Sequence, residues 1–474
     1  MSAYDVFIGL EIHIHLLCAS KQFCGCRAQF GGEPNAHTCP VCLGYPGVLP
    51  AANEESMKMA FLVARALECE LSKKCFFDRK NYFYPDMTKN YQISQFHDPV
   101  GRNGRFDIEV DGAVRTIRIH DVHLEEDAGK MIHQGRCSLL DYNRAGSPLL
   151  EIVTEPDLRS AVEAEAFIRE FRRLVRHLGV CDGNMEEGSL RCDANVSINH
   201  PGAGLGTKTE VKNVNSARFV RKALEFEIRR QARLLDKGER VIQETRLWDA
   251  DKGATAGMRT KEKAHDYRYF PEPDMPPFVP DEPFLAEVAS RMVERPLQRK
   301  QRYVATLDIA PDTADFLVEE LDAGRLFEAL LTGNIAPKTA ANWIAGDVQA
   351  QLKRADTALQ GSHITPERLS GLIAMVEEGR LPRGKAKEVL ELVIARDEDP
   401  VAIVAEMGWE QVLDDGELDG WVVQVIAANP DVVQKVKGGD GKPLAFLMGQ
   451  IMKMSKGKAD PKRAREKLEQ AIAG

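Results

Sequence analysis

The feature that most constrains the fold is a proline-rich stretch, PEPDMPPFVPDEP, at residues 271–283. Before it, strand-like and helix-like patterns alternate; after it, the strand-like patterns fade and helical patterns remain. Proline interrupts both kinds of regular structure, so such a stretch indicates a domain boundary. We therefore expect a multidomain α+β protein, with a mixed domain over 1–290, an all-helical domain over 291–405 and a small helical tail domain over 406–474.

Length and composition agree with this division. The 474 residues exceed what one hydrophobic core usually organises. A content of 43% hydrophobic and 28% charged residues is typical of a globular protein, and no apolar run reaches the length of about eighteen residues that spans a membrane. The N-terminus lacks the basic and then apolar pattern of a signal peptide. We expect a cytoplasmic protein without a membrane segment.

Local signals predict several elements. An Asp-Gly pair divides the alternating stretch 106–119 and predicts a hairpin. Ser160 is placed to cap a helix over about 161–178, and a second helix is expected to begin near Ser216. Thr365 precedes a proline and is expected to open a helix beyond the proline-rich stretch.

The stretch GLEIHIHL at residues 9–16 alternates with the period of a β-strand. Its apolar residues share one face, and Glu11, His13 and His15 share the other. A solvated sheet edge explains this polar row, and so does a site for a metal ion or a charged substrate. The stretch alone leaves both explanations open.

Two pairs of cysteines, Cys24 and Cys26 followed by Cys39 and Cys42, have the spacing of a four-thiolate zinc site. Such a closed site is structural, because no position is left for a substrate. The alternative is that the four thiols are simply reduced and buried.

Clusters of acidic residues recur through the mixed domain and predict a magnesium site, because Mg²⁺ prefers oxygen ligands. The clusters are HLEEDAGK (123–130), LLEIVTEPD (149–157), MEEGSLRCDANVSI (185–198) and TEVKNVN (209–215). Cations suited to phosphate chemistry, Lys80 and Lys89, stand in the aromatic-rich stretch KNYFYPDMTKNYQISQF (80–96).

Taken together, these motifs resemble the B subunits of the glutamine-dependent aminoacyl-tRNA amidotransferases. The matching runs also include QETRLWD, DYRYFPEPDMPP and FLMGQIMKMSKGKADP, so the resemblance extends over nearly the whole chain. It implies a cradle-shaped α/β catalytic domain followed by a helical domain and a helical tail.

The resemblance also implies the reaction. Members of this family use ATP and Mg²⁺ to phosphorylate the side-chain carboxylate of Glu or Asp misacylated onto tRNA(Gln) or tRNA(Asn), and ammonia then displaces phosphate. The ammonia comes from glutamine hydrolysed in the amidase-fold A subunit, and a heterotrimer is completed by the small C subunit. Our chain has no Gly- and Ser-rich amidase signature, so we expect it not to make its own ammonia.

The resemblance assigns roles to individual residues. The residues matched to its magnesium ligands are Glu11, His13, Glu126 and Glu151; those matched to the phosphorylation step are Lys80, Lys89 and Asp193, with Glu210 as a weaker addition; those matched to a zinc site that some members have are Cys24, Cys26, Cys39 and Cys42. His15 departs from the family pattern, which has Gln or Glu there, and receives no catalytic role.

The tail is expected to bind tRNA. Residues 431–474 hold ten Lys or Arg against five Asp or Glu, a net +5 in a chain of net charge −9. Lys453, Lys456 and Lys458 are the expected phosphate contacts, and a solvated helix end is the alternative. An alternative for the whole chain is a non-catalytic, zinc-containing tRNA-binding scaffold, although the acidic clusters suit a surface that binds RNA poorly.

Overall fold

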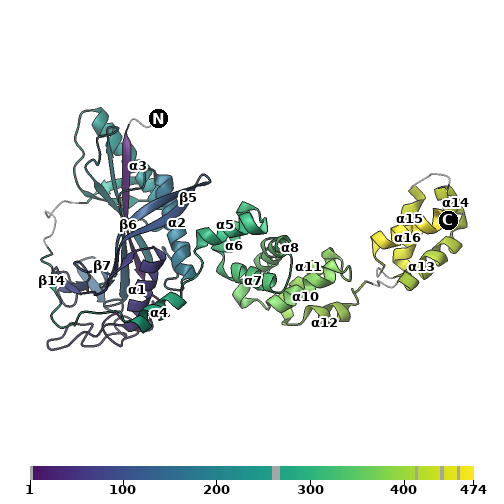
Figure 1. Ribbon diagram of the computed structural model, residues 1–474, viewed down its shortest axis with the longest axis horizontal. Coiled ribbons are helices and arrows are strands. Elements are labelled where there is room, and N and C mark those ends of the chain that lie inside the picture. The colour runs from purple at the N-terminus through teal and green to yellow at the C-terminus, as the bar shows by residue number, and fades with distance from the viewer. Residues whose placement is uncertain (1–3, 259–266, 412–414, 438–441, 456–458, 474) are drawn as a thin grey trace. The chain divides into compact units, whose positions relative to one another are not determined.

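The computed structural model describes residues 4–258, 267–411, 415–437, 442–455 and 459–473 (Figure 1). The chain forms two compact units, Met1–Arg299 and Lys300–Gly474. The first contains all the strands of the described chain, and the second is helical. This arrangement confirms the predicted multidomain α+β class.

The first unit is built on a nine-stranded sheet that is antiparallel except between β11 and β12. Its strands are, in spatial order, β13 (Ala254–Gly257), β12 (Thr245–Asp249), β11 (Thr209–Lys212), β10 (Leu190–Asn199), β1 (Asp5–His15), β9 (Pro148–Thr154), β6 (Ala113–Glu126), β5 (Gly101–Val110) and β2 (Glu70–Leu71). The GLEIHIHL stretch therefore lies on the central strand, β1, between β10 and β9.

Two smaller sheets complete the strand content of the described chain. A three-stranded sheet has the order β14 (Phe270–Pro271), β3 (Asp78–Asn81) and β4 (Tyr91–Ser94). A hairpin joins β7 (Lys130–Gln134) to β8 (Cys137–Asp141). The three-stranded sheet brings residues near 80 and 270 side by side, although they are distant in sequence.

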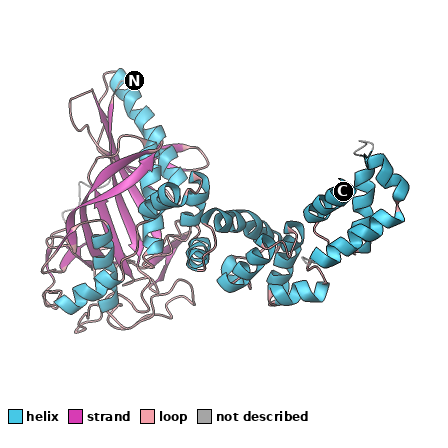
Figure 2. Ribbon diagram, turned by 45° about the vertical axis from the view of Figure 1, so that its right-hand side comes forward, coloured by secondary structure: helices cyan, strands magenta, loops and turns pink. Residues whose placement is uncertain are grey.

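Helices cover one face of the large sheet (Figures 1 and 2). They are α1 (Glu54–Ala66), α2 (Ala161–His177), α3 (Ala217–Asp236) and α4 (Glu282–Ser290). Phe167 and Phe171 of α2 share a hydrophobic core with Ile8 and Ile12 of β1. Because side chains alternate along a strand, the odd-numbered residues of β1 point away from the helices.

Local sequence signals act as predicted. The hairpin of β5 and β6 turns at Asp111 and Gly112, which both have positive φ, as a two-residue hairpin turn requires. The hydroxyl groups of Ser160 and Ser216 accept hydrogen bonds from backbone N–H groups in the first turns of α2 and α3. Thr365 does the same for α10 (Pro366–Glu377). These predictions are confirmed.

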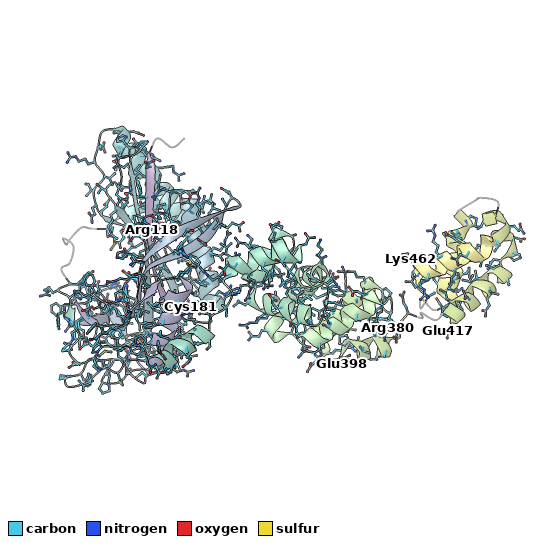
Figure 3. The ribbon with its side chains drawn as sticks, in the orientation of Figure 1. Arg118, Cys181, Arg380, Glu398, Glu417 and Lys462 are labelled. Atoms are coloured by element: carbon cyan, nitrogen blue, oxygen red, sulfur yellow. The ribbon has the colours of Figure 1, made fainter. Side chains whose placement is uncertain are left out.

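The second unit consists of helices. They are α5 (Pro296–Leu307, which begins in the first unit), α6 (Pro311–Glu319), α7 (Leu321–Thr332), α8 (Pro337–Asn342), a π-helical segment (Trp343–Val348), α9 (Gln349–Arg354), a 3₁₀ turn (Leu359–Gly361), α10, α11 (Arg383–Arg396), α12 (Pro400–Met407), α13 (Asp415–Ala428), α14 (Pro430–Lys437), α15 (Lys442–Met454) and α16 (Pro461–Ala473). Surface ion pairs are common here; Arg380, labelled in Figure 3, pairs with Glu410 at 2.6 Å.

The described residues of the second unit form two separate hydrophobic clusters. One runs from Tyr303 to Val404 and the other from Leu418 to Ile472. The helix that follows the prolines, α4, contributes Phe284 to the core of the first unit. Separate cores support the division into domains 1–290, 291–405 and 406–474, which stays a prediction.

Candidate active site

The polar row of β1 lies on the sheet face opposite the helices of the first unit. Ile12 and Ile14 are fully buried in the core, whereas His13 and His15 lie on the opposite face and are partly exposed. The neighbouring strands add polar residues on the same face, so the row extends over five strands. These residues are Arg191, Asp193 and Asn195 on β10, Glu151 on β9, Asp121, His123 and Glu125 on β6, and Glu210 and Lys212 on β11.

The centre of this face is formed by His13, Glu125 and Glu151. The Nε2 atom of His13 lies 3.2 Å from Oε2 of Glu151 and 3.8 Å from Oε1 of Glu125. One ligand atom from each side chain falls within 4.8 Å of the other two. Strand register produces the arrangement, because His13 is directly opposite Glu151 across β1 and β9.

A second imidazole fixes the carboxylate of Glu151. His123 contacts Oδ1 of Asp121 through Nδ1 at 2.8 Å and Oε2 of Glu151 through Nε2 at 3.0 Å. Burial lowers the pKa of His123, but the charges of Glu151 and Asp121 outweigh it and hold this pKa well above the ordinary value. Burial likewise raises the pKa of Glu151, but His123 and His13 hold it well below the ordinary value. Glu151 is therefore ionised and oriented.

Glu126, the residue after Glu125, contacts a different partner. The Nζ atom of Lys89 lies 2.6 Å from Oε1 of Glu126 and donates to its Oε2 at 2.7 Å, and the backbone N–H of Ile93 donates to Oε1 at 3.0 Å. Glu126 is only 2% exposed. The predicted ligands His13 and Glu151 are thus brought together with Glu125, while Glu126 is held by the predicted cation Lys89. The metal-binding role of Glu126 stays a prediction.

The other predicted residues form the edge of the centre. Asn195 donates to Oε1 of Glu11 at 2.8 Å, and burial followed by the charge of Glu151 raises the pKa of Glu11. The ammonium of Lys212 bridges Asp193 at 2.7 Å and Glu210 at 3.0 Å. The proposed acidic residues of β10 and β11 therefore share one lysine.

Lys80 of β3 approaches the centre from the three-stranded sheet. Its ammonium lies 5.0 Å from the ring centroid of Tyr267. Burial lowers the pKa of Lys80, but the charges of Glu125 and Glu151 among others outweigh burial and raise it. A charged lysine beside carboxylates that share a histidine suits the binding of phosphate groups together with a metal ion.

His15 lies beside the centre in a separate ionic cluster. Its Nε2 atom is 2.6 Å from Oδ2 of Asp127, which also accepts from Arg191 at 3.0 Å and lies 3.3 Å from Arg144. Burial raises the pKa of Asp127, but the hydrogen bond with His15 and the charges of Arg191 and Arg144 hold it well below the ordinary value. His15 is therefore engaged in an ion-pair network rather than in the His13 centre.

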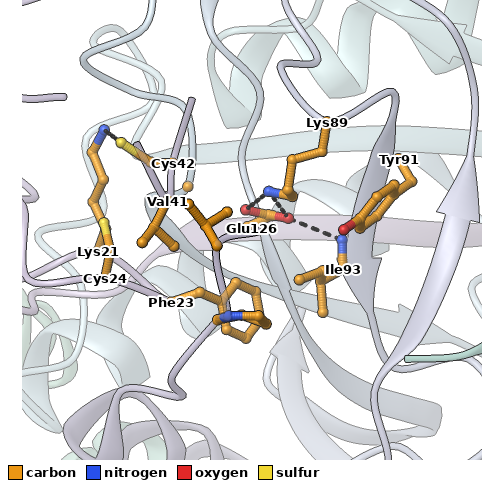
Figure 4. A pocket seen from close by; sticks show the side chains of 12 residues that line it. Lys21, Phe23, Cys24, Val41, Cys42, Lys89, Tyr91, Ile93 and Glu126 are labelled. Carbon is orange, nitrogen blue, oxygen red and sulfur yellow. Dashed lines mark hydrogen bonds and ion pairs between the residues drawn. The ribbon is translucent and has the colours of Figure 1, made fainter. Parts of the chain in front are cut away.

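The four predicted cysteines form the second candidate metal site. The four sulfur atoms all lie within 4.8 Å of one another, which fits tetrahedral thiolate coordination. The buried ammonium of Lys21 lies 3.5 Å from Sγ of Cys42, and this contact is drawn in Figure 4. Hydrogen bonds from Cys24 and from the backbone N–H of Cys39, together with the charge of Lys21, outweigh burial and lower the pKa of Cys42 to about 4. The site thus favours a thiolate at Cys42, the form that binds zinc.

The cysteine turn also contacts the segment that carries Lys89. The hydroxyl of Thr88 donates to the backbone carbonyl of Cys42 at 2.7 Å. Gly44 has φ +69°, and a side chain there would come within 2.7 Å of Cγ of Lys89. A small cavity lies between the two segments, lined among others by Lys21, Cys42, Lys89 and Glu126 (Figure 4).

Sequence reasoning missed Asp121, and it included His123 and Glu125 only within an acidic cluster, without a role for either residue. A signal was present, because DVHLE alternates polar and apolar residues like GLEIH. In the tail, Lys453 is exposed in the last turn of α15, whereas Lys456 and Lys458 lie outside the described residues. Of the described helices, none is long and apolar enough to cross a membrane.

Comparison with known proteins finds two family models. One, described as the GatB/GatE catalytic domain, matches residues 6–286, and the other, described as the GatB domain, matches residues 325–472. The chain is also similar over its whole length to curated proteins that are named as B subunits of aspartyl/glutamyl-tRNA(Asn/Gln) amidotransferase. It is 45% identical to that of Carboxydothermus hydrogenoformans, with 100% of both chains covered, and 45% identical to that of Geobacter sulfurreducens, with 99% of this chain and 100% of the relative covered.

Proposed function

Because the chain belongs to the family of aspartyl/glutamyl-tRNA(Asn/Gln) amidotransferase B subunits, we propose that the polar face around His13, Glu125 and Glu151 is where it activates the amino acid on tRNA. Members convert misacylated Glu-tRNA(Gln) or Asp-tRNA(Asn), and the enzyme is an ATP-dependent ligase that forms carbon–nitrogen bonds with glutamine as amide donor. The chain is one subunit of this enzyme and works together with the others on tRNA.

The juxtaposition of His13, Glu125 and Glu151 carries the proposal. Two carboxylates and one imidazole within 4.8 Å of one another fit a divalent cation, with the oxygens as the ligands that Mg²⁺ prefers. Bound there, Mg²⁺ would neutralise charge on phosphate oxygens. His123 orients Glu151, and Asn195 holds Glu11 at the edge of the same face.

The reaction that this face would support has two steps. The side-chain carboxylate of the tRNA-bound amino acid attacks the γ-phosphorus of ATP, and ADP leaves with the electrons of the broken P–O bond. Ammonia then attacks the acyl carbon, and phosphate leaves. The charge of Lys80 offsets charge on the transferring phosphoryl group. We also propose roles in this step for Lys89, Asp193 and Glu210.

The second metal site is proposed to be structural. Zn²⁺ held by Cys24, Cys26, Cys39 and Cys42 would leave no coordination position for a substrate. Lys21 supplies one positive charge beside the thiolates. Because the cysteine turn contacts Thr88, zinc would stabilise the segment next to Lys89.

The remaining partners are proposed from the family resemblance. They are the amidase-fold A subunit, which is the glutaminase, the small C subunit, which completes a heterotrimer, and tRNA, held by the tail through Lys453, Lys456 and Lys458. Charged tRNA as the substrate supports a cytoplasmic location. The alternative of a non-catalytic scaffold is disfavoured, because a catalytic-domain model matches residues 6–286.

Glu151→Gln in the assembled enzyme tests the proposal, since it keeps the size of the side chain and removes its charge. With Glu-tRNA(Gln), ATP, Mg²⁺ and glutamine, we expect phosphorylation and Gln-tRNA formation to fall while tRNA affinity is unchanged. Asp107→Asn is the control, because Asp107 accepts a hydrogen bond from the hydroxyl of Thr116 in another part of the sheet. Normal phosphorylation by Glu151→Gln would exclude this face as the site.

A further inference from the structure

Two aromatic rings form an open stack at the margin of the candidate active site. The rings of Phe96 and Tyr269 are nearly parallel, with an interplanar angle of 9° and centroids 4.1 Å apart. Phe96 remains 56% exposed although Tyr269 stacks on it. Neither ring belongs to the hydrophobic core of the first unit. The edge contact with the ring of His97, at a centroid distance of 5.1 Å, still leaves more than half of Phe96 exposed among the residues that the structure describes.

The backbone around Phe96 is tied to the active-site strand β6. The side chain of Gln95 accepts a hydrogen bond from the backbone N–H of Leu124 at 2.9 Å, and the hydroxyl of Ser94 lies 3.5 Å from Oε2 of Glu125. Two residues of chain span at most about 7 Å, so Phe96 follows closely after a direct contact with the carboxylate centre. The N–H of Phe96 donates to Asp78 at 2.9 Å, which fixes its orientation.

Tyr269 directly precedes β14, which forms the edge of the three-stranded sheet opposite β4. It immediately precedes Phe270, which is paired with Arg79, so Tyr269 lies beside Lys80. Its ring centroid is 6.0 Å from that of Tyr267, over which the Lys80 ammonium lies. The stack and the cation proposed to bind phosphate are thus neighbours.

We propose that Phe96 and Tyr269 form a stacking platform for an adenine base whose sugar and phosphates extend toward Lys80 and the carboxylate centre. Every base offers a π-face to an aromatic side chain, and both substrates of the reaction carry adenine: ATP, and the 3′-terminal adenosine of tRNA that bears the amino acid. The inference rests on the proposed function, because it takes the carboxylate centre as the place of phosphoryl transfer.

The position of the stack favours this occupant over an apolar protein segment. An exposed aromatic stack next to a lysine and a group of carboxylates combines stacking with the charges that a nucleotide and its metal ion need. An exposed aromatic ring in the same unit without such surroundings is Phe30, which is 78% exposed and has no ring contact among the described residues. It provides a matched control.

The test uses the assembled enzyme carrying Phe96→Leu, Tyr269→Leu, Phe96→Trp or Phe30→Leu. The KM for ATP and the KM for Glu-tRNA(Gln) are measured separately. Loss of one stacked base corresponds to about a fivefold to hundredfold rise in KM. We expect Phe96→Leu and Tyr269→Leu to raise the same KM, and Phe96→Trp and Phe30→Leu to leave both near normal.

The two arms identify the source of the base. A rise in the KM for ATP alone assigns the platform to ATP, and a rise in the KM for Glu-tRNA(Gln) alone assigns it to the tRNA end. Unchanged values of both in Phe96→Leu, or equal effects of Phe96→Leu and Phe30→Leu, overturn the proposal. Either result is distinguishable from failure of the proposed function, which Glu151→Gln reports independently through phosphorylation. Circular dichroism of each variant, and its incorporation into the heterotrimer, verify that it is folded.

Discussion

Glu125 and Glu126 are adjacent in the chain and both are buried, but they contact different partners. Glu125 lies beside His13, whereas Glu126 is held by Lys89. A strand directs successive side chains to opposite sides, so only one of two adjacent carboxylates reaches a given centre. At the scale of the residue, this orientation determines which of the two carboxylates lies beside His13.

We predict that Glu125→Gln lowers the rate of ATP-dependent Gln-tRNA formation by about a hundredfold to a thousandfold, because the centre loses one anionic ligand for a hard cation. The concentration of Mg²⁺ at half-maximal rate should also rise. Initial rates at several Mg²⁺ concentrations measure both effects, with Asp107→Asn as the control. A normal rate at low Mg²⁺ would exclude Glu125 from the metal site.

Asp127 gives a prediction about pH. Burial raises its pKa, but His15, Arg191 and Arg144 outweigh burial and hold the pKa in the folded chain well below the unfolded value of about 3.9. The ionised form therefore stabilises the fold above about pH 4, and this contribution is lost as pH falls through the folded pKa. We expect Asp127→Asn to lower the free energy of unfolding of the first unit by about 1–3 kcal/mol at pH 7.

The pH dependence of that loss distinguishes its cause. Urea unfolding at pH 8, 6 and 4.5 should give a difference between Asp127→Asn and the unaltered enzyme at each pH, since Asp127 and the two arginines stay charged throughout this interval. A difference that is absent at pH 8 and appears only at the lower pH values would contradict stabilisation through the two arginines. Equal stability at pH 7 would show that the two arginines contribute nothing through Asp127.

At the scale of the element, local signals predicted much of the fold. The turn at Asp111, the caps at Ser160 and Ser216 and the alternation of β1 depend only on neighbours in the chain, and the structure contains all of them. The pairing of Glu126 with Lys89 could not be predicted in this way. It requires β4 and β6 to meet, and their contact depends on the whole three-stranded sheet.

The cysteine turn is an element whose metal content can be tested. We predict that the enzyme contains about one zinc per chain, and that Cys39→Ser with Cys42→Ser releases it, since half of the ligands are lost. Hydrogen exchange should then increase in residues 20–45 and in the segment around Thr88, whose hydroxyl donates a hydrogen bond to the backbone carbonyl of Cys42. Cys137→Ser is the control, because Cys137 is exposed and separate from the cluster. Absence of zinc from protein prepared without chelators would leave only reduced thiols.

At the scale of the whole molecule, the division of labour between this chain and the other subunits becomes testable. The chain is proposed to activate and amidate the amino acid but not to hydrolyse glutamine. We expect the isolated chain, given ammonium chloride, ATP, Mg²⁺ and Glu-tRNA(Gln), to form some Gln-tRNA without the glutaminase. Glutaminase activity in the rigorously purified single chain would contradict this division.

The tail gives the last prediction, because tRNA must be bound by a chain whose net charge is −9. Electrostatic attraction then has to come from a local excess of cations, and residues 431–474 carry a net charge of +5. Lys453 is exposed at the end of α15, close in sequence to Lys456 and Lys458. Replacing all three by Ala should raise the KM for tRNA without changing the KM for ATP. If each lysine contacts one phosphate, the slope of log affinity against log salt should become smaller by about 0.7–0.9 for each lysine removed.

Lys338→Ala is the control, because Lys338 is a lysine paired with Asp308 in the other helical cluster. An unchanged tRNA KM and salt slope would mean that these lysines are simply solvated, and that the chain reads tRNA through another surface.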